Sequence, residues 1–180
     1  MRILVGFTSR HGATAEIAAR IGDVLREVVT DADPTCVVEV RDLVDLGDVS
    51  GYDAVVIGSA VYLGRWSATA RMFVKHNAAE LRTRPVWLFS SGPVAGVPAA
   101  VEDSSEVRAL GALVGVRGHR LFPGRLRLAE LGFTERLAVR AAHAEDSDFR
   151  DWYDVASWAV DVADDLLACA APDPITGVPV

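Results

Sequence analysis

The chain has 180 residues, 51% apolar and 24% charged, a composition that suits one folded domain with one substantial core. Its 25 acidic and 18 basic residues give a net charge of −7, and the basic residues are scattered, so we expect no nucleic acid partner. The sequence shows no pattern of a signal peptide and no apolar run of membrane length, which predicts a cytoplasmic location without an integral membrane segment.

Short apolar runs rich in β-branched residues predict the strands of a sheet. The first four are bounded by Gly, Asp, Ser or Pro, and several are continuous rather than alternating, which is typical of strands buried on both faces. The runs are RILVGF (2–7), CVVEV (36–40), DAVVIGSA (53–60), PVWLFSS (85–91) and the strand-like GHRLFPGRL (118–126).

Helical patterns lie between and after these strands. Apolar residues at helical spacing predict helices over residues 15–29, about 67–81, about 102–113, about 130–142 and about 152–168. Between the second and third strands, residues 41–53 offer only a brief turn or loop. The last helix places Trp152 with its apolar face, where we expect core packing. The alternating order predicts an α/β fold with a parallel sheet.

The stretch FTSRHGAT, Phe7–Thr14, lies where the first strand turns into the first helix. Such a turn exposes unpaired backbone N–H groups at the positive end of the helix dipole, and a phosphate fits there. Gly12 would let a ligand approach closely, and Ser9 and Thr14 could donate hydroxyl hydrogen bonds. In the alternative interpretation Ser9 or Thr8 simply caps the helix. This stretch by itself favours neither.

Several other functional classes are excluded by missing patterns. GxxxxGK[ST] is absent, and no GxGxxG follows the first strand, which disfavours a nucleoside triphosphatase and a Rossmann dehydrogenase. A receiver domain needs acidic residues where Phe7, Thr8, Gly58 and Ser59 stand. GxSxG, HExxH and a histidine cluster are absent, and the two cysteines have no metal-ligand spacing, so we expect no serine hydrolase and no metal site.

Three loops should meet at the carboxyl edge of such a sheet. The first is TSRHGAT, the second is VYLGRW, in which Tyr62 and Trp66 flank Gly64, and the third is GPVAG. A phosphate turn, an aromatic loop and a small flexible loop together suit a planar aromatic cofactor that carries one phosphate. Trp66 could instead pack on the helix that follows it.

With these loops the sequence resembles the flavodoxin family, and within it the short proteins related to menaquinone-dependent protoporphyrinogen oxidase. The family's phosphate loop, [ST]-x-T-G-x-T, is matched by Ser9, Gly12 and Thr14, with His11 at the place of the middle threonine. The segment from Ile57 to Leu81 resembles the third strand, flavin loop and following helix of the oxidase relatives. Two late segments, LFPGRL and DFRDWYDVASWA, are also similar to theirs.

The resemblance implies a flavodoxin-like, three-layer, doubly wound fold with a five-stranded parallel sheet of order 2-1-3-4-5. It implies one FMN-binding domain over residues 1–171, a tail over 172–180, and FMN bound without a covalent bond. The implied phosphate site consists of Ser9, Arg10, His11, Gly12, Ala13 and Thr14. The implied ring site consists of Ala60, Val61, Tyr62, Leu63, Gly64, Trp66, Ser91, Gly92, Pro93 and Gly96. No catalytic residue is assigned.

The leading functional hypothesis is an FMN-dependent oxidoreductase directed at a porphyrinogen or a quinone. The first alternative is a flavodoxin-type carrier that moves electrons between protein partners, and the second is a binding module of the same fold without flavin. The expected partners are accordingly a redox protein, a quinone or another small molecule. The late segments favour the enzyme over the carrier.

Overall fold

A computed structural model of the chain describes residues 1–62, 64–92, 105–127, 129 and 146–170. Five parallel strands form its central sheet in the order β2-β1-β3-β5-β6. They are β1 (Arg2–Thr8), β2 (Val37–Asp42), β3 (Ala54–Tyr62), β5 (Val86–Ser91) and β6 (Gly118–Phe122). Counted along the chain, these five strands have the predicted order 2-1-3-4-5, so the predicted fold class is confirmed.

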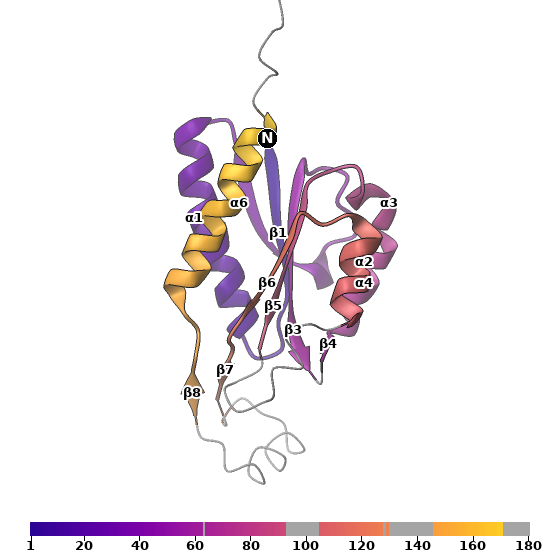
Figure 1. The fold of residues 1–180 in the computed structure, drawn as a ribbon, viewed down its shortest axis with the longest axis vertical. Helices are drawn as coiled ribbons and strands as arrows, with labels where there is room; N and C mark the ends of the chain where they lie inside the picture. The colour runs from indigo at the N-terminus through magenta and orange to yellow at the C-terminus, as the bar shows by residue number, and fades with distance from the viewer. Residues whose placement is uncertain (63, 93–104, 128, 130–145, 171–180) are drawn as a thin grey trace, which may run out of the picture.

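Three short strands lie at the carboxyl edge of this sheet. The two-residue strand β4 (Arg65–Trp66) folds back antiparallel on β3. The strands β7 (Arg125–Leu126) and β8 (Ser147–Asp148) pair with each other as a separate antiparallel ribbon. Both features lie at the lower end of the molecule in Figure 1, where the parallel strands end.

Helices cover both faces of the sheet (Figure 1). On one face lie α1 (Ala13–Ala32) and α6 (Trp152–Ala170), and their contacts join the two ends of the chain. On the other face lie α2 (Ala68–His76), α3 (Ala78–Leu81) and α4 (Ser105–Val114). This arrangement is the three-layer α/β sandwich that the alternating sequence predicts.

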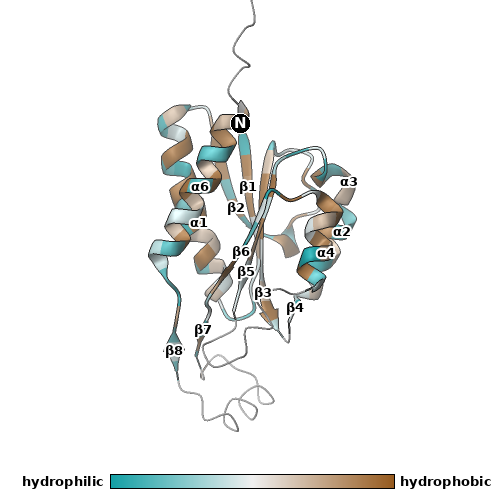
Figure 2. Cartoon of the chain, in the orientation of Figure 1, coloured by the Kyte–Doolittle hydropathy of each residue, from teal (hydrophilic) through white to brown (hydrophobic). Residues whose placement is uncertain are grey.

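The three central strands, β1, β3 and β5, each contribute to two cores because successive side chains point to opposite faces. On β1, Ile3 and Val5 pack toward α1 and α6, whereas Leu4 packs toward α2 and α4. On β5, Phe89 points to the first core, where it meets Phe122 and other aromatic side chains. The helices themselves mix hydrophobic and hydrophilic residues (Figure 2), as expected for helices with one buried side. Burial on both faces explains why the sequences of these central strands are continuously apolar.

Two predicted helices differ in detail from the structure, and a third cannot be compared. The helix expected over about 67–81 is divided at Asn77, whose side-chain amide donates to the carbonyl of Phe73, so α2 ends there and α3 begins anew. Trp152 is 40% exposed at the start of α6, so its expected place in the core was wrong. The brief crossing between the second and third strands is confirmed as the 3-10 turn Leu43–Asp45. The helix expected over about 130–142 lies outside the described residues.

Within the described ranges, the apolar stretches of the helices are too short or too charged to traverse a lipid bilayer. The same ranges hold no grouping of three or more His, Cys, Asp or Glu residues suited to a metal ion.

Candidate functional site at the carboxyl edge of the sheet

The first loop leaves the start of α1 without a side-chain cap. Gly12 is the N-cap residue and has a left-handed backbone with φ of 76°, which glycine adopts without strain. The N-cap position, Gly12, has no side chain, Ser9 Oγ has no hydrogen-bond partner among the described residues, and Thr8 Oγ1 bonds to Ser59 and Ser67, so the interpretation that Ser9 or Thr8 caps this helix was wrong. The exposed N–H groups and the helix dipole therefore point at the loop before Gly12.

Two hydroxyl side chains stand beside this uncapped turn. Ser9 Oγ is shielded from solvent and has no hydrogen-bond partner among the described residues. Thr14, in the first turn of α1, is only 1% exposed. A buried hydroxyl without a partner costs roughly 1–3 kcal/mol, which a ligand that accepts a hydrogen bond would relieve. Arg10 is exposed, and His11 and Ala13 are half-buried on either side of Gly12.

The second loop is a tight hairpin between β3 and β4. Val61 pairs with Trp66 and Tyr62 pairs with Arg65, so the chain reverses direction between them. Gly64 has φ of 74°, the conformation that tight hairpin turns require. Tyr62 is 43% exposed at the end of the hairpin, whereas Ala60 is half-buried. Leu63 lies outside the described residues.

Trp66 belongs to the core, and the expectation that it stacks on a flavin ring is corrected here. Its side chain is only 2% exposed, and its indole N–H donates to Ser90 Oγ at 2.8 Å. A side chain that covers a cofactor would show one face to solvent when the cofactor is absent, and Trp66 shows none. The alternative, in which Trp66 packs against its own surroundings, is the one the geometry supports.

An ion cluster holds this hairpin against α4. Glu106 accepts hydrogen bonds from the Arg65 and Arg71 guanidinium groups and from the backbone N–H of Trp66. Burial alone would raise the pKa of Glu106, but the hydrogen bonds from Arg71 and Arg65 outweigh burial and hold that pKa below its ordinary value. The loop that carries Tyr62 is therefore fixed from outside the sheet.

The third loop begins at Ser91 and Gly92, directly beside the second. Gly92 has φ of 106° and donates its N–H to the carbonyl of Phe122 at 2.9 Å. A Cβ on Gly92 would lie 3.5 Å from the carbonyl oxygen of Val61, so the two loops are in contact. Pro93 and Gly96 lie outside the described residues, so their expected part in the site stays a prediction.

Hydroxyl groups join the first two loops below the surface. Thr8 Oγ1 lies 2.7 Å from Ser67 Oγ and donates to Ser59 Oγ at 3.3 Å. Ser59 Oγ also accepts from the backbone N–H of Ser67 at 3.0 Å. The ends of β1 and β3 and the start of α2 thus share one buried polar network. The structure brings the described parts of all three predicted loops together at one edge.

A charged cluster lies at this edge between α1 and the segment that precedes α6, and the sequence patterns did not identify it. Glu16 on α1 accepts from Arg125 Nη1 at 2.7 Å and from Arg150 Nη1 at 2.6 Å. Arg150 also donates to both oxygens of Asp148 and packs over the Trp152 ring at 4.5 Å. The two arginines stand in the LFPGRL and DFRDW segments, but their partner is 109 and 134 residues away, so no local signal could pair them.

The cluster lowers the pKa values of its two acidic residues, Glu16 and Asp148. Burial alone would raise the pKa of Glu16, but hydrogen bonds from Arg150 and Arg125 outweigh burial and hold it below the ordinary range. The hydrogen bond from Arg150 lowers the pKa of Asp148 as well. Both carboxylates therefore stay ionised to a lower pH than unpaired carboxylates would.

The residues present fit a phosphate-bearing planar cofactor. The uncapped helix start and the Ser9 hydroxyl suit a phosphate, and Gly12 offers no side chain that would obstruct it. The exposed ring of Tyr62 and the backbone of Ser91 and Gly92 border the place where a ring system would lie.

A family model described as a flavodoxin domain matches residues 4–152. The protoporphyrinogen IX dehydrogenase [quinone] of Escherichia coli strain K12 is 32% identical over 98 residues, which are 54% of this chain and 52% of that protein. The chain thus matches about half the length of the curated relative.

Solved structures share the fold at low sequence identity. Oxidised flavodoxin 1 from Bacillus cereus aligns with a TM-score of 0.59 and 15% identity, over 91% of this chain and 98% of that one. The rubredoxin oxygen:oxidoreductase of Desulfovibrio gigas aligns with a TM-score of 0.64 and 11% identity, over 95% of this chain and 37% of that one. These similarities support the fold.

Proposed function

Because this chain belongs to the flavodoxin domain family, we propose that it is an FMN-dependent oxidoreductase that acts on a quinone or a porphyrinogen. FMN binds without a covalent bond at the carboxyl edge of the sheet. One observation carries the proposal: the first loop leaves the buried Ser9 hydroxyl and the uncapped start of α1 beside each other. A phosphate can accept hydrogen bonds both from this hydroxyl and from the backbone N–H groups at the start of the helix.

Each part of the edge has a separate task in this proposal. Ser9, Thr14 and the backbone N–H groups of residues 10–14 hold the phosphate, with Arg10 adding positive charge. Tyr62 covers one face of the ring, and the backbone of residues 60–64 and of Ser91 to Gly96 bonds the ring edge. When bound, FMN supplies a ring that accepts and returns one or two electrons. The chain's own task is to orient that ring and to leave one edge open to the substrate.

The substrate class rests on the curated relative. That protein is named for protoporphyrinogen IX and for quinone, and its matched half is 32% identical to this chain. We extend the same two substrate classes to this chain as the first to be tested. The exposed edge beside Tyr62 is where such a planar molecule would approach the ring.

The first experiment is to purify the protein, record its visible spectrum, and measure binding of FMN, FAD and riboflavin by calorimetry. We expect flavin absorbance, tight FMN binding and much weaker FAD binding, because the described edge offers one phosphate turn. Turnover is then followed with a water-soluble naphthoquinone and with protoporphyrinogen as separate substrates. Absence of flavin binding after reconstitution with excess FMN would overturn the proposal, and equal FAD affinity would contradict the single-phosphate site.

A flavodoxin-type electron carrier is the second candidate, and the charge of the chain favours it. A net charge of −7 suits steering toward a basic protein partner, and it suits an anionic lipid surface less well. A carrier would exchange electrons rapidly with a reductase protein and would show no saturable turnover of quinone or porphyrinogen. The two assays therefore separate the candidates on one flavin-loaded sample.

A further inference from the structure

Arg125 reaches the phosphate loop from a distant part of the chain. It stands on β7, and its side chain is only 7% exposed. One terminal nitrogen, Nη1, donates to Glu16 Oε1 at 2.7 Å, and the other, Nη2, donates to the carbonyl of His11 at 3.2 Å. Nη2 also lies 3.5 Å from the position that a Cβ on Gly12 would occupy. The guanidinium thus lies against the peptide that joins His11 to Gly12.

That peptide needs an external restraint. Gly12 has a left-handed backbone with φ of 76°, and glycine occupies many conformations at little cost. A planar trans peptide points its C=O and its N–H in opposite directions. Holding the His11 carbonyl toward Arg125 therefore turns the Gly12 N–H away from Arg125. An N–H fixed in advance binds an anion better than one that must first be ordered.

Arg125 is itself held in place by charge. Glu16 shares its two carboxylate oxygens between Arg125 and Arg150, and Arg150 is in turn fixed by both oxygens of Asp148. The Arg150 side chain is only 4% exposed. Charge-assisted hydrogen bonds of this kind are shorter and stronger than neutral ones. The series from Asp148 through Arg150, Glu16 and Arg125 therefore ends on the carbonyl of the phosphate loop.

We propose that Arg125 is a positioning residue for the cofactor phosphate: it holds the His11 carbonyl so that the Gly12 N–H is presented to the phosphate. This inference rests on the proposed FMN site and adds a specificity determinant to it. This positioning role requires a guanidinium group rather than a point charge, because two nitrogens at a fixed separation must reach Glu16 and the His11 carbonyl together. An ammonium group has three N–H donors, but they diverge from a single nitrogen on a flexible stem, so it does not hold two acceptors in the fixed geometry of the planar guanidinium.

The test compares FMN with riboflavin, which lacks the phosphate, in calorimetric titrations of the full chain. We expect Arg125→Gln and Arg125→Lys each to weaken FMN binding about tenfold while riboflavin binding changes less than about twofold. Arg120→Gln is the matched control, since it removes an arginine that pairs with Asp154 on α6 and touches no phosphate-loop residue in the described contacts. It should leave both affinities unchanged, and melting temperatures of all variants check that each one folds.

Three results would overturn the assignment. One is wild-type FMN affinity in Arg125→Lys, which would make the effect one of charge alone. Another is equal loss of FMN and riboflavin, which would make Arg125 a general support of the fold. The third comes from the unliganded protein, where the amide resonance of Gly12 should shift in Arg125→Lys and an unchanged resonance would refute the restraint. If the wild type binds no flavin but this resonance shifts, the proposed function falls and the restraint by Arg125 stands.

Discussion

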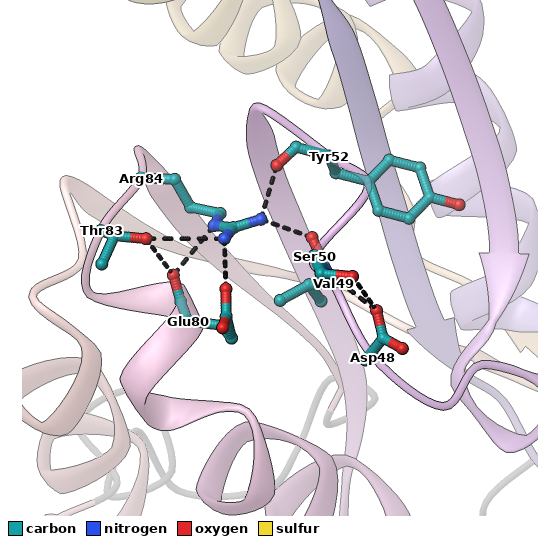
Figure 3. Close-up of polar contacts among 7 residues, drawn as sticks. All are labelled: Asp48, Val49, Ser50, Tyr52, Glu80, Thr83 and Arg84. Carbon is teal, nitrogen blue, oxygen red and sulfur yellow. Dashed lines mark hydrogen bonds and ion pairs between the residues drawn. The ribbon is translucent and has the colours of Figure 1, made fainter.

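The polar groups at the amino edge and at the carboxyl edge of the sheet differ in whether they have hydrogen-bond partners within the protein. At the amino edge, Arg84 donates to the backbone carbonyls of Val49, Tyr52 and Glu80 and to the Glu80 carboxylate (Figure 3). Its side chain is 11% exposed, and each of its three guanidinium nitrogens has a protein acceptor. At the carboxyl edge, Ser9 Oγ has no acceptor or donor among the described residues, and α1 begins without a side-chain cap. Groups that satisfy one another stabilise the fold, whereas groups left unsatisfied at an edge are available to a ligand.

Trp66 sharpens this comparison because it lies at the carboxyl edge but is packed like a core residue. We expect Trp66→Ala to lower the free energy of unfolding by about 3–5 kcal/mol, since a buried indole and its hydrogen bond to Ser90 are lost. Urea unfolding measures this change. Trp152→Ala, at a position 40% exposed, is the matched control and should cost far less. Wild-type stability together with brighter bound-flavin fluorescence in Trp66→Ala would restore the stacking role.

Replacing Arg84 tests whether the hydrogen bonds at the amino edge stabilise the fold and do not contribute to FMN binding. We expect Arg84→Ala to lower the free energy of unfolding by about 2–4 kcal/mol, because two backbone carbonyls near the start of β3 lose a charged donor. FMN affinity should stay unchanged, since the site lies at the other end of the sheet. Arg82→Ala, two residues away and exposed, is the control in the same urea titrations. A stability loss no greater than that of the control would show that the network contributes little.

Thr14 tests the ligand-binding character of the carboxyl edge. We expect Thr14→Ala to weaken FMN binding by about 1–3 kcal/mol, because a buried donor to a charged acceptor is removed. Thr14→Ser keeps the hydroxyl and should retain most of the affinity. Riboflavin titrations serve as the second control and should not distinguish the variants. If the FMN dissociation constant of Thr14→Ala equals that of the wild type, the phosphate is not held by this loop.

Glu16 gives the smallest expected effect. The pKa of Glu16 is lowered in the folded protein, so its pairing stabilises the fold above the pKa of an unfolded glutamate, about 4.3. That stability is lost as the pH falls through the lower folded pKa. The side chain is 47% exposed, so solvent screening limits the effect to at most about 1 kcal/mol. Urea midpoints between pH 3 and pH 7 should fall more steeply at the acid end for the wild type than for Glu16→Gln, and parallel curves would contradict the assignment.

The sequence by itself determined the layers of the fold and the place of the loops. Continuous apolar strands between amphipathic helices require a sheet covered on both faces, and parallel strands must bring the ends of β1, β3 and β5 to one edge. These are consequences of local patterns, which is why the meeting of the described loops was predictable, whereas the strand order 2-1-3-4-5 came from the family resemblance. The same patterns place Ser9, Gly12 and Thr14 at a strand-to-helix turn.

Only the tertiary structure decided which of the loop side chains face the edge and what restrains them. Trp66 and Tyr62 are both aromatic residues of one hairpin, but the antiparallel pairing buries the first and exposes the second. Asn77 ends α2 through a hydrogen bond that helical periodicity does not reveal. Arg125 meets Glu16 across 109 residues of chain, a contact that depends on how β7 lies against α1. Burial and long-range pairing are properties of the packed chain, so no local pattern could specify them.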